Sequence, residues 1–114
     1  RPRPTCPIPI FTPAPPYPVL HLYGCNVEIA SYGLTICAER NTVFYAVVCG
    51  CRHFVALAIT GDSKDLTAPC GACRQVMAEF KIPEVILARP DDSYAVCPLQ
   101  KLLPLAFADT TMKE

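Results

Sequence analysis

The sequence predicts one layered α/β domain built around a mixed, partly parallel sheet. Short apolar stretches with β character alternate with two longer amphipathic stretches, in the order strand, helix, strand, helix, strand, strand. This order is typical of strands and helices packed in layers, with some strands joined in parallel by a helical crossover. The chain has 114 residues, of which 52% are hydrophobic, so one domain with a real core is expected.

Residues 1–18 have a composition of their own, because eight of the thirteen prolines lie there. Proline fixes φ and lacks the amide proton, so neither a helix nor a central strand is expected. We therefore predict an irregular, extended tail over residues 1–18 and a folded domain over residues 19–114. A proline-rich ligand for another domain is the alternative function for this segment.

The first half of the folded region predicts a strand, a turn and a helix. A strand is expected over residues 19–23, with a possible continuation over 25–28 after the break at Gly24. A turn is expected over residues 31–35. A helix follows from residue 36 or 37, with Thr35 as its cap and Gly50 at its end.

The second half predicts three strands and two helices. Pro69 suits the N-terminal boundary of a helix. The expected elements are a buried strand over 54–60, a polar turn over 61–65, a helix over 70–80, strands over 85–88 and 94–97 around a turn at 89–92, and a short helix over 99–103.

Charge and cysteine content exclude several classes of function. Ten acidic and ten basic residues cancel, so the chain lacks the basic footprint of a protein that binds nucleic acid or anionic membrane. No apolar run is long enough for a transmembrane span, and no signal-peptide pattern is visible.

Eight cysteines could form a disulfide framework, but most lie in apolar helix or strand patterns. We expect reduced cysteines in a cytoplasmic protein.

Cys37, Cys70 and Cys73 are the candidate metal ligands. The pair Cys70 and Cys73 alone could be a redox pair, half of a structural zinc site or chance. The upstream Cys37 and Glu39, two residues after it, make a catalytic zinc site the better interpretation: three thiolates bind the ion and one position stays open for water. This pattern is described for zinc nucleobase deaminases. Each cysteine is expected at a helix start, where the dipole favours thiolate.

Three charged residues around these cysteines are candidates for chemistry. Three thiolates and one Zn²⁺ sum to one negative charge, and Arg40 and Arg74 could offset it by donating to sulfur. The alternative is that both are solvated surface arginines. Glu39 is close enough in sequence to carry a proton from an activated water to a substrate, and the alternative for it is a surface glutamate in the first helical turn.

The chain resembles the small cytidine deaminases that form homotetramers. The resemblance rests on four segments in order, which cover about three quarters of the chain: Gly24–Glu28, Ser31–Arg40, Ala68–Val76 and Leu102–Phe107. It implies a three-layer α/β/α sandwich with a mixed central sheet and one zinc ion per chain. It also implies hydrolytic deamination of cytidine and 2′-deoxycytidine in pyrimidine salvage, with no nucleic acid polymer and no membrane as partner.

The resemblance also implies roles for individual residues. Cys37, Cys70 and Cys73 match the zinc ligands and Glu39 the proton shuttle, while Arg40 matches an arginine that bonds ligand sulfurs. For the substrate, Asn26 and Glu28 match the pair that grips the ribose hydroxyl. They lie two residues apart, so on a strand they would share a face. Ala38 matches a position whose backbone contacts the base. Tyr32 and Phe107 match aromatic residues near subunit boundaries, and Phe107 is expected to approach a neighbour's active site.

Two departures from the family pattern leave rival hypotheses open. Ile29 stands where the family usually has Asn, and residues 1–18 show neither the usual first helix and strand nor the aromatic that stacks on the pyrimidine. A truncated, alternatively spliced or frame-shifted start is one hypothesis. One rival function is a weakly active or inactive relative that keeps zinc for folding. Another is deamination of a different aminopyrimidine nucleoside or of a polynucleotide.

Overall fold

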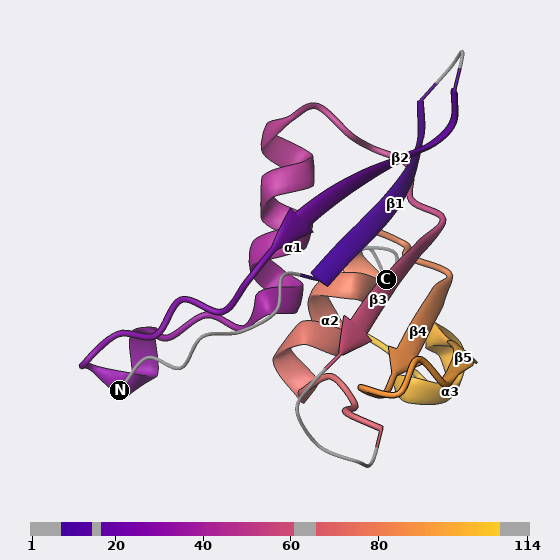
Figure 1. The fold of residues 1–114 in the computed structure, drawn as a ribbon. Helices are drawn as coiled ribbons and strands as arrows, with labels where there is room; N and C mark the ends of the chain where they lie inside the picture. The colour runs from indigo at the N-terminus through magenta and orange to yellow at the C-terminus, as the bar shows by residue number, and fades with distance from the viewer. Residues whose placement is uncertain (1–7, 15–16, 61–65, 108–114) are drawn as a thin grey trace.

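A computed structural model of the chain describes residues 8–14, 17–60 and 66–107, which form a sheet flanked by helices (Figure 1). The strands are β1 (Ile8–Ala14), β2 (Tyr17–Gly24), β3 (Ala56–Thr60), β4 (Glu84–Ala88) and β5 (Tyr94–Pro98). The helices are α1 (Ala38–Val48), α2 (Gly71–Glu79) and α3 (Leu99–Leu102), and a 3-10 turn, η1 (Tyr32–Leu34), precedes α1. The polar turn predicted at 61–65 lies outside the described residues, as do residues 1–7 and 15–16 of the proline-rich segment.

The sheet is mixed, as predicted. Its strand order is β2-β1-β3-β4-β5, and β3 pairs with β4 in parallel while the other neighbouring pairs are antiparallel. The parallel pair requires a crossover, and α2 provides it. The α/β class and the partly parallel sheet predicted from the order of elements are therefore confirmed.

The prediction of an irregular tail over residues 1–18 is wrong for β1, which lies between β2 and β3. Ile8, Ile10 and Thr12 are all buried, which is the period of two that a strand requires. Pro13 lies where the register with β2 shifts between Thr12 and Ala14, and a proline is tolerated at such an irregularity. The strand expected to be missing from the start of the domain is thus supplied by β1.

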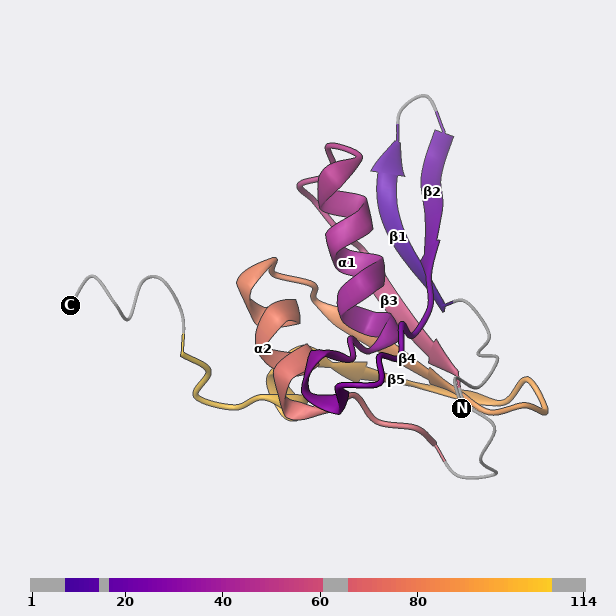
Figure 2. The same cartoon turned by 90° about the vertical axis from the view of Figure 1, so that its left-hand side faces the viewer.

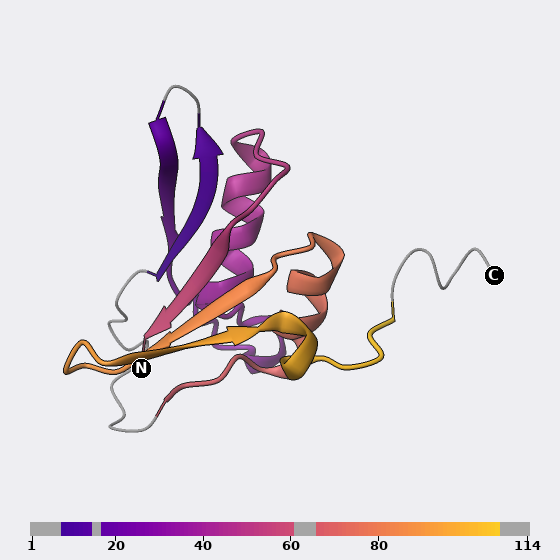
Figure 3. The same ribbon diagram turned by 90° about the vertical axis from the view of Figure 1, so that its right-hand side faces the viewer.

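Both long helices cover the same face of the sheet (Figure 3), and Figure 2 shows α1 and α2 side by side over it. The core lies between them and the sheet. Its largest fully buried members are Ile8, Ile10, Val43, Leu57, Met77, Ile82 and Val85. On the other face Tyr23, Tyr94 and Val96 are about half exposed or more. Among the described residues no helix covers that face, so two layers of the expected α/β/α sandwich are present.

The described residues bear on the cysteine and membrane expectations as well. Seven cysteines lie in the described ranges, and all seven are free thiols. No helix in those ranges has the length and apolar character needed to cross a membrane. Because the seven thiols are free, they can act as metal ligands, and the buried ones pack as small apolar side chains.

Candidate metal centre and active site

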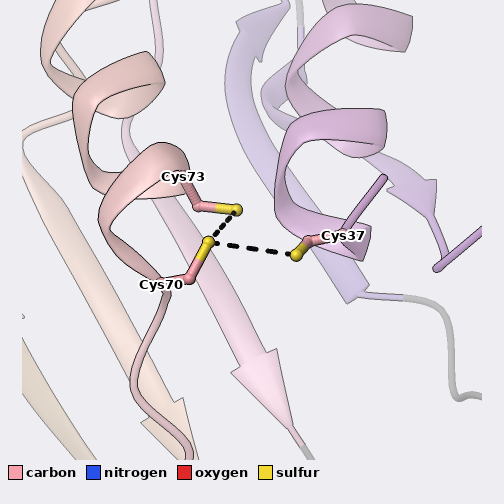
Figure 4. A group of neighbouring side chains, drawn as sticks. All are labelled: Cys37, Cys70 and Cys73. Atoms are coloured by element: carbon pink, nitrogen blue, oxygen red, sulfur yellow. Dashed lines mark hydrogen bonds between the residues drawn. The ribbon is translucent and has the colours of Figure 1, made fainter. Parts of the chain in front are cut away.

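Three cysteine side chains meet where α1 and α2 begin (Figure 4). Cys37 is the N-cap of α1, Cys70 is the N-cap of α2, and Cys73 lies in the first turn of α2. The Sγ atoms of Cys37 and Cys70 are 3.9 Å apart, and those of Cys70 and Cys73 are 3.4 Å apart. The three sulfurs all lie within 4.8 Å of one another, so the predicted convergence of two helix starts is present. We call these residues the three-cysteine cluster.

Local sequence explains why both helices begin at a cysteine. Cys37 and Cys70 both have the extended backbone that N-cap residues usually adopt. Pro69 is fully buried directly before Cys70 and excludes an earlier helix start. We predicted that Thr35 caps α1, but the N-cap is Cys37. The Thr35 hydroxyl instead forms hydrogen bonds with the backbone of Ile29, so that prediction is wrong.

The cluster fits a zinc ion. Tetrahedral zinc with bonds of about 2.3 Å to sulfur requires sulfurs about 3.8 Å apart, and the observed separations of 3.4 and 3.9 Å lie on either side of that value. The donors are three thiols, which are soft ligands suited to zinc. Three ligands leave a tetrahedral ion one further position, which is the arrangement of a catalytic site.

Burial and hydrogen bonding together give Cys70 and Cys73 different proton affinities. Burial raises the pKa of the Cys73 thiol well above its usual range, and the neighbouring Cys70 and the Glu39 charge add to this effect. At Cys70 burial also opposes ionisation, but hydrogen bonds from the Cys73 backbone and side chain outweigh it and lower the pKa. A metal ion that binds here must therefore displace a firmly held proton from Cys73.

Arg40 is the cation that faces the cluster. Its Nη2 donates to the Sγ of Cys37 at 3.7 Å. Hydrogen bonds to Cys37 and Cys73 raise the pKa of Arg40 further, so the guanidinium stays charged beside the sulfurs. Its Nε is buried and has no partner among the described residues. One positive charge here offsets the one negative charge of three thiolates around a divalent ion.

Arg74 does not contact a sulfur in the way we expected. Its Nε donates to the Pro69 carbonyl and its Nη1 to the Leu102 carbonyl, both at 2.8 Å. Carbonyl oxygens at this distance are better acceptors than a thiolate further away. Arg74 therefore joins the start of α2 to the end of α3, and the expectation that it compensates thiolate charge is corrected.

Glu39 occupies the second position of α1 and is only 9% exposed. Its place in the first turn of α1, two residues after Cys37, puts it next to the cluster, and its negative charge adds to the raised pKa of Cys73. A glutamate that merely stabilised the helix dipole would normally lie in solvent. Its burial beside the cysteines favours a chemical role over that of a surface residue.

Asn26 and Glu28 lie on either side of Val27, whose backbone pairs with Ile36 in an isolated bridge. The strand predicted over residues 25–28 is reduced to this bridge, because no further pairs extend it in the described residues. Asn26 Oδ1 accepts a bond of 2.8 Å from the Ala38 N–H, at the start of α1. Asn26 is thus held beside the cluster, while Glu28 is exposed two residues further along.

The predicted aromatic residues lie at the surface of the chain. Tyr32 is 77% exposed on η1, and Phe107 is 58% exposed. The Phe107 carbonyl accepts a hydrogen bond of 2.7 Å from Gln75 Nε2, which fixes its backbone near α2. Neither ring is part of the hydrophobic core.

Asn41 is a further residue of this site that the sequence pattern did not indicate. Its Nδ2 donates to the Cys25 carbonyl at 2.8 Å and to the Ile36 carbonyl at 3.3 Å. The sequence offers one weak signal for Asn41, which is that asparagine is a poor helix former and still lies within the α1 pattern. Nothing in the local pattern indicates a partner 16 residues away.

Comparisons with known proteins agree with this geometry. Residues 20–89 match the family described as the cytidine and deoxycytidylate deaminase zinc-binding region, a range that contains all three cysteines and Glu39. A crystal structure of cytidine deaminase from Burkholderia pseudomallei is similar, with a TM-score of 0.80 and 42% identity. That match covers 89% of this chain and 80% of the Burkholderia chain.

Two curated relatives have similar sequences over the same region. The cytidine deaminase of Sporosarcina psychrophila is 45% identical over 89 residues, which are 75% of this chain and 65% of the relative. The probable cytidine deaminase of Dictyostelium discoideum is 46% identical over 86 residues, which are 75% of this chain and 58% of the relative. The matched region thus spans less than two thirds of the length of either relative.

Proposed function

The chain belongs to the cytidine and deoxycytidylate deaminase family, and we propose that it hydrolyses cytidine and 2′-deoxycytidine to uridine and 2′-deoxyuridine with release of ammonia. The observation that carries this proposal is the buried Glu39 beside a three-cysteine cluster that fits one zinc ion per chain. A zinc site kept only for folding has no use for a buried carboxylate at that place. The inactive-relative hypothesis is therefore not favoured.

Zinc, when bound by Cys37, Cys70 and Cys73, supplies the Lewis acidity that activates water. The chain's own residues then transfer protons and position the substrate. Glu39 accepts a proton from the attacking water and delivers it to the pyrimidine ring nitrogen. Glu39 then takes the second proton from the added hydroxyl and delivers it to the amino group, as the carbonyl forms and the carbon–nitrogen bond breaks. Water is consumed, ammonia leaves, and the carboxylate returns to its initial state.

Electrostatic balance at the cluster is the proposed role of Arg40. Its hydrogen bond to Cys37 draws negative charge from a ligand sulfur. With less charge on the sulfurs, a zinc ion held by these residues would polarise water more strongly. Arg74 contributes indirectly, since its bond to the Pro69 carbonyl orients the residue before Cys70.

Substrate recognition is assigned to Asn26 and Glu28 at the sugar and to Ala38 at the base. Ala38 lies between a ligand and the proton shuttle, and its N–H is bonded to Asn26 Oδ1. The Asn26 Nδ2 has no acceptor among the described residues, so it is available to donate to a sugar oxygen. A carboxylate at Glu28 accepts from a sugar hydroxyl. We call residues 25–28 the sugar-binding segment.

We further propose a homotetramer in which Phe107 approaches a neighbour's active site. Large apolar side chains are exposed along η1 and α1, as expected of a surface covered by another subunit. They are Tyr32, Leu34, Phe44, Tyr45 and Val48. The seven free thiols support a reducing compartment, which we propose is the cytoplasm, with a role in pyrimidine salvage.

The test measures zinc content and cytidine turnover on the same purified sample. We expect about one zinc per chain and turnover that falls by on the order of 10²- to 10⁴-fold in Glu39→Gln at equal zinc loading. Glu79→Gln is the matched control, because Glu79 is exposed at the end of α2. Full zinc loading with no difference between the wild type and Glu39→Gln would refute the proposed activity.

A further inference from the structure

Asn41 bonds three backbone carbonyls around the start of α1. Its N–H donates to the Cys37 carbonyl at 3.1 Å, which is the first turn of the helix. Its side-chain Nδ2 donates to the Cys25 carbonyl at 2.8 Å and to the Ile36 carbonyl at 3.3 Å. One residue thus joins the sugar-binding segment to the residue before a zinc ligand and to that ligand itself.

The chemistry of these contacts requires an amide. Both side-chain partners of Asn41 are carbonyl oxygens, which only accept, so two donors are needed on the same atom. The amide NH₂ has two donors, whereas a carboxylate of the same shape has none. Aspartate at this position would turn both attractions into repulsions between oxygens.

Few other contacts hold the sugar-binding segment in place. Residues 25–34 are all exposed, so burial contributes little to their position. The Val27 and Ile36 backbones exchange two hydrogen bonds of 3.0 Å, and Asn26 Oδ1 accepts from Ala38 N–H. Asn41 adds the contact at Cys25, directly before Asn26, and a second bond to the Ile36 carbonyl that already accepts from Val27.

We propose that Asn41 is a positioning residue for substrate recognition, and this rests on the proposed cytidine deaminase function. By holding the Cys25 and Ile36 carbonyls together, it sets the distance between the sugar-binding segment and the three-cysteine cluster. Asn26 and Glu28 then meet the sugar while the base lies over Ala38 and Glu39. Asn41 itself does not touch the reacting atoms.

A purely structural role would weaken the enzyme toward every substrate alike. A positioning role affects only substrates whose sugar hydroxyls use Asn26 and Glu28. The two roles are therefore separated by comparing cytidine with 2′,3′-dideoxycytidine, which keeps the base and lacks both hydroxyls. The informative quantities are KM and kcat for each nucleoside.

The experiment compares Asn41→Asp with Gln100→Glu, which makes the same amide-to-acid change at an exposed position of α3. In Asn41→Asp we expect KM for cytidine to rise about tenfold, with kcat and zinc content near those of the wild type. For 2′,3′-dideoxycytidine we expect kcat/KM to change less than about threefold. An equal loss for both nucleosides, or no loss for cytidine, would overturn the proposal.

A second measurement keeps the inference testable without activity. Hydrogen exchange of the Val27 amide should be about tenfold faster in Asn41→Asp than in the wild type, while amides of α2 keep their rates. Unchanged exchange at Val27 would overturn the inference. Absence of cytidine turnover in the zinc-loaded wild type would instead overturn the proposed function, and the exchange result would still decide whether Asn41 holds the segment.

Discussion

The three-cysteine cluster and the sugar-binding segment are neighbours that the fold holds in different ways. The cysteines lie at the starts of two helices that pack into the core, and Cys73 is completely buried. The sugar-binding segment is exposed and depends on individual hydrogen bonds to α1. The metal site is therefore positioned by the packing of the whole domain, and the substrate contacts are positioned by a few polar groups.

Removing a buried ligand tests the first half of this comparison and should have the largest effect. In Cys73→Ser we expect zinc content to fall from about one per chain to below about a tenth. Turnover should fall by about 1000-fold or more, since the ion's contribution to the reaction is lost. Metal analysis and cytidine assays on one sample measure both quantities.

Cys49→Ser is the matched control, because Cys49 is an exposed cysteine at the other end of α1. It should keep both zinc and activity. Equal zinc in the two serine variants would contradict the assignment of the three-cysteine cluster as the metal site.

Gly24→Ala tests how closely the end of β2, directly before the sugar-binding segment, must approach α1. A Cβ atom at Gly24 would lie 2.7 Å from both the backbone N and the Cα of Thr42, so the end of β2 would have to move away from the helix. We expect a loss of about 2–3 kcal/mol in the free energy of unfolding. Urea unfolding curves of the zinc-loaded protein measure it.

Gly33→Ala provides the comparison for Gly24→Ala. A Cβ atom at Gly33 meets nothing within 4 Å, so its effect should stay within about 0.5 kcal/mol. A loss for Gly24→Ala as small as the one expected for Gly33→Ala would show that β2 does not need its close approach to α1.

The two arginines allow electrostatic and structural support of the cluster to be separated. Arg40→Gln removes the charge bonded to Cys37, and we expect kcat to fall about tenfold with zinc retained. Arg74→Gln removes bonds to the Pro69 and Leu102 carbonyls, so we expect about 1–2 kcal/mol less stability and a smaller change in kcat. Reversed effects, with Arg40→Gln unstable and Arg74→Gln slow, would contradict this division.

The metal site could be predicted because its signals are local. Cys70 and Cys73 are three residues apart, Glu39 is two residues after Cys37, and each group lies at a helix start that the apolar pattern also indicates. Helix and strand positions from α1 onward followed for the same reason. In each case the pattern that decides the structure lies within one element.

Three of the errors have a common physical cause, which is that the deciding partner lies far away in sequence. Proline content argued against a strand at β1, but pairing of Ile10 with Leu57 on β3 and burial of alternate residues prevailed. Arg74 was expected at a nearby sulfur and instead bonds a carbonyl 28 residues away. Asn41 was missed because its acceptor is 16 residues upstream.

Thr35→Val should have the smallest effect, because Thr35 lies outside the sugar-binding segment. The Thr35 hydroxyl accepts from the Ile29 N–H at 3.0 Å, but neither residue takes part in the hydrogen bonds that join Cys25 and Asn26 to α1. The bond is exposed, so water replaces it at little cost, and we expect about 0.5 kcal/mol or less in stability. KM for cytidine should rise less than about threefold, well below the rise expected for Asn41→Asp. If both variants raised KM equally, the segment would behave as one flexible loop, and the contacts at the start of α1 would not be what positions the sugar.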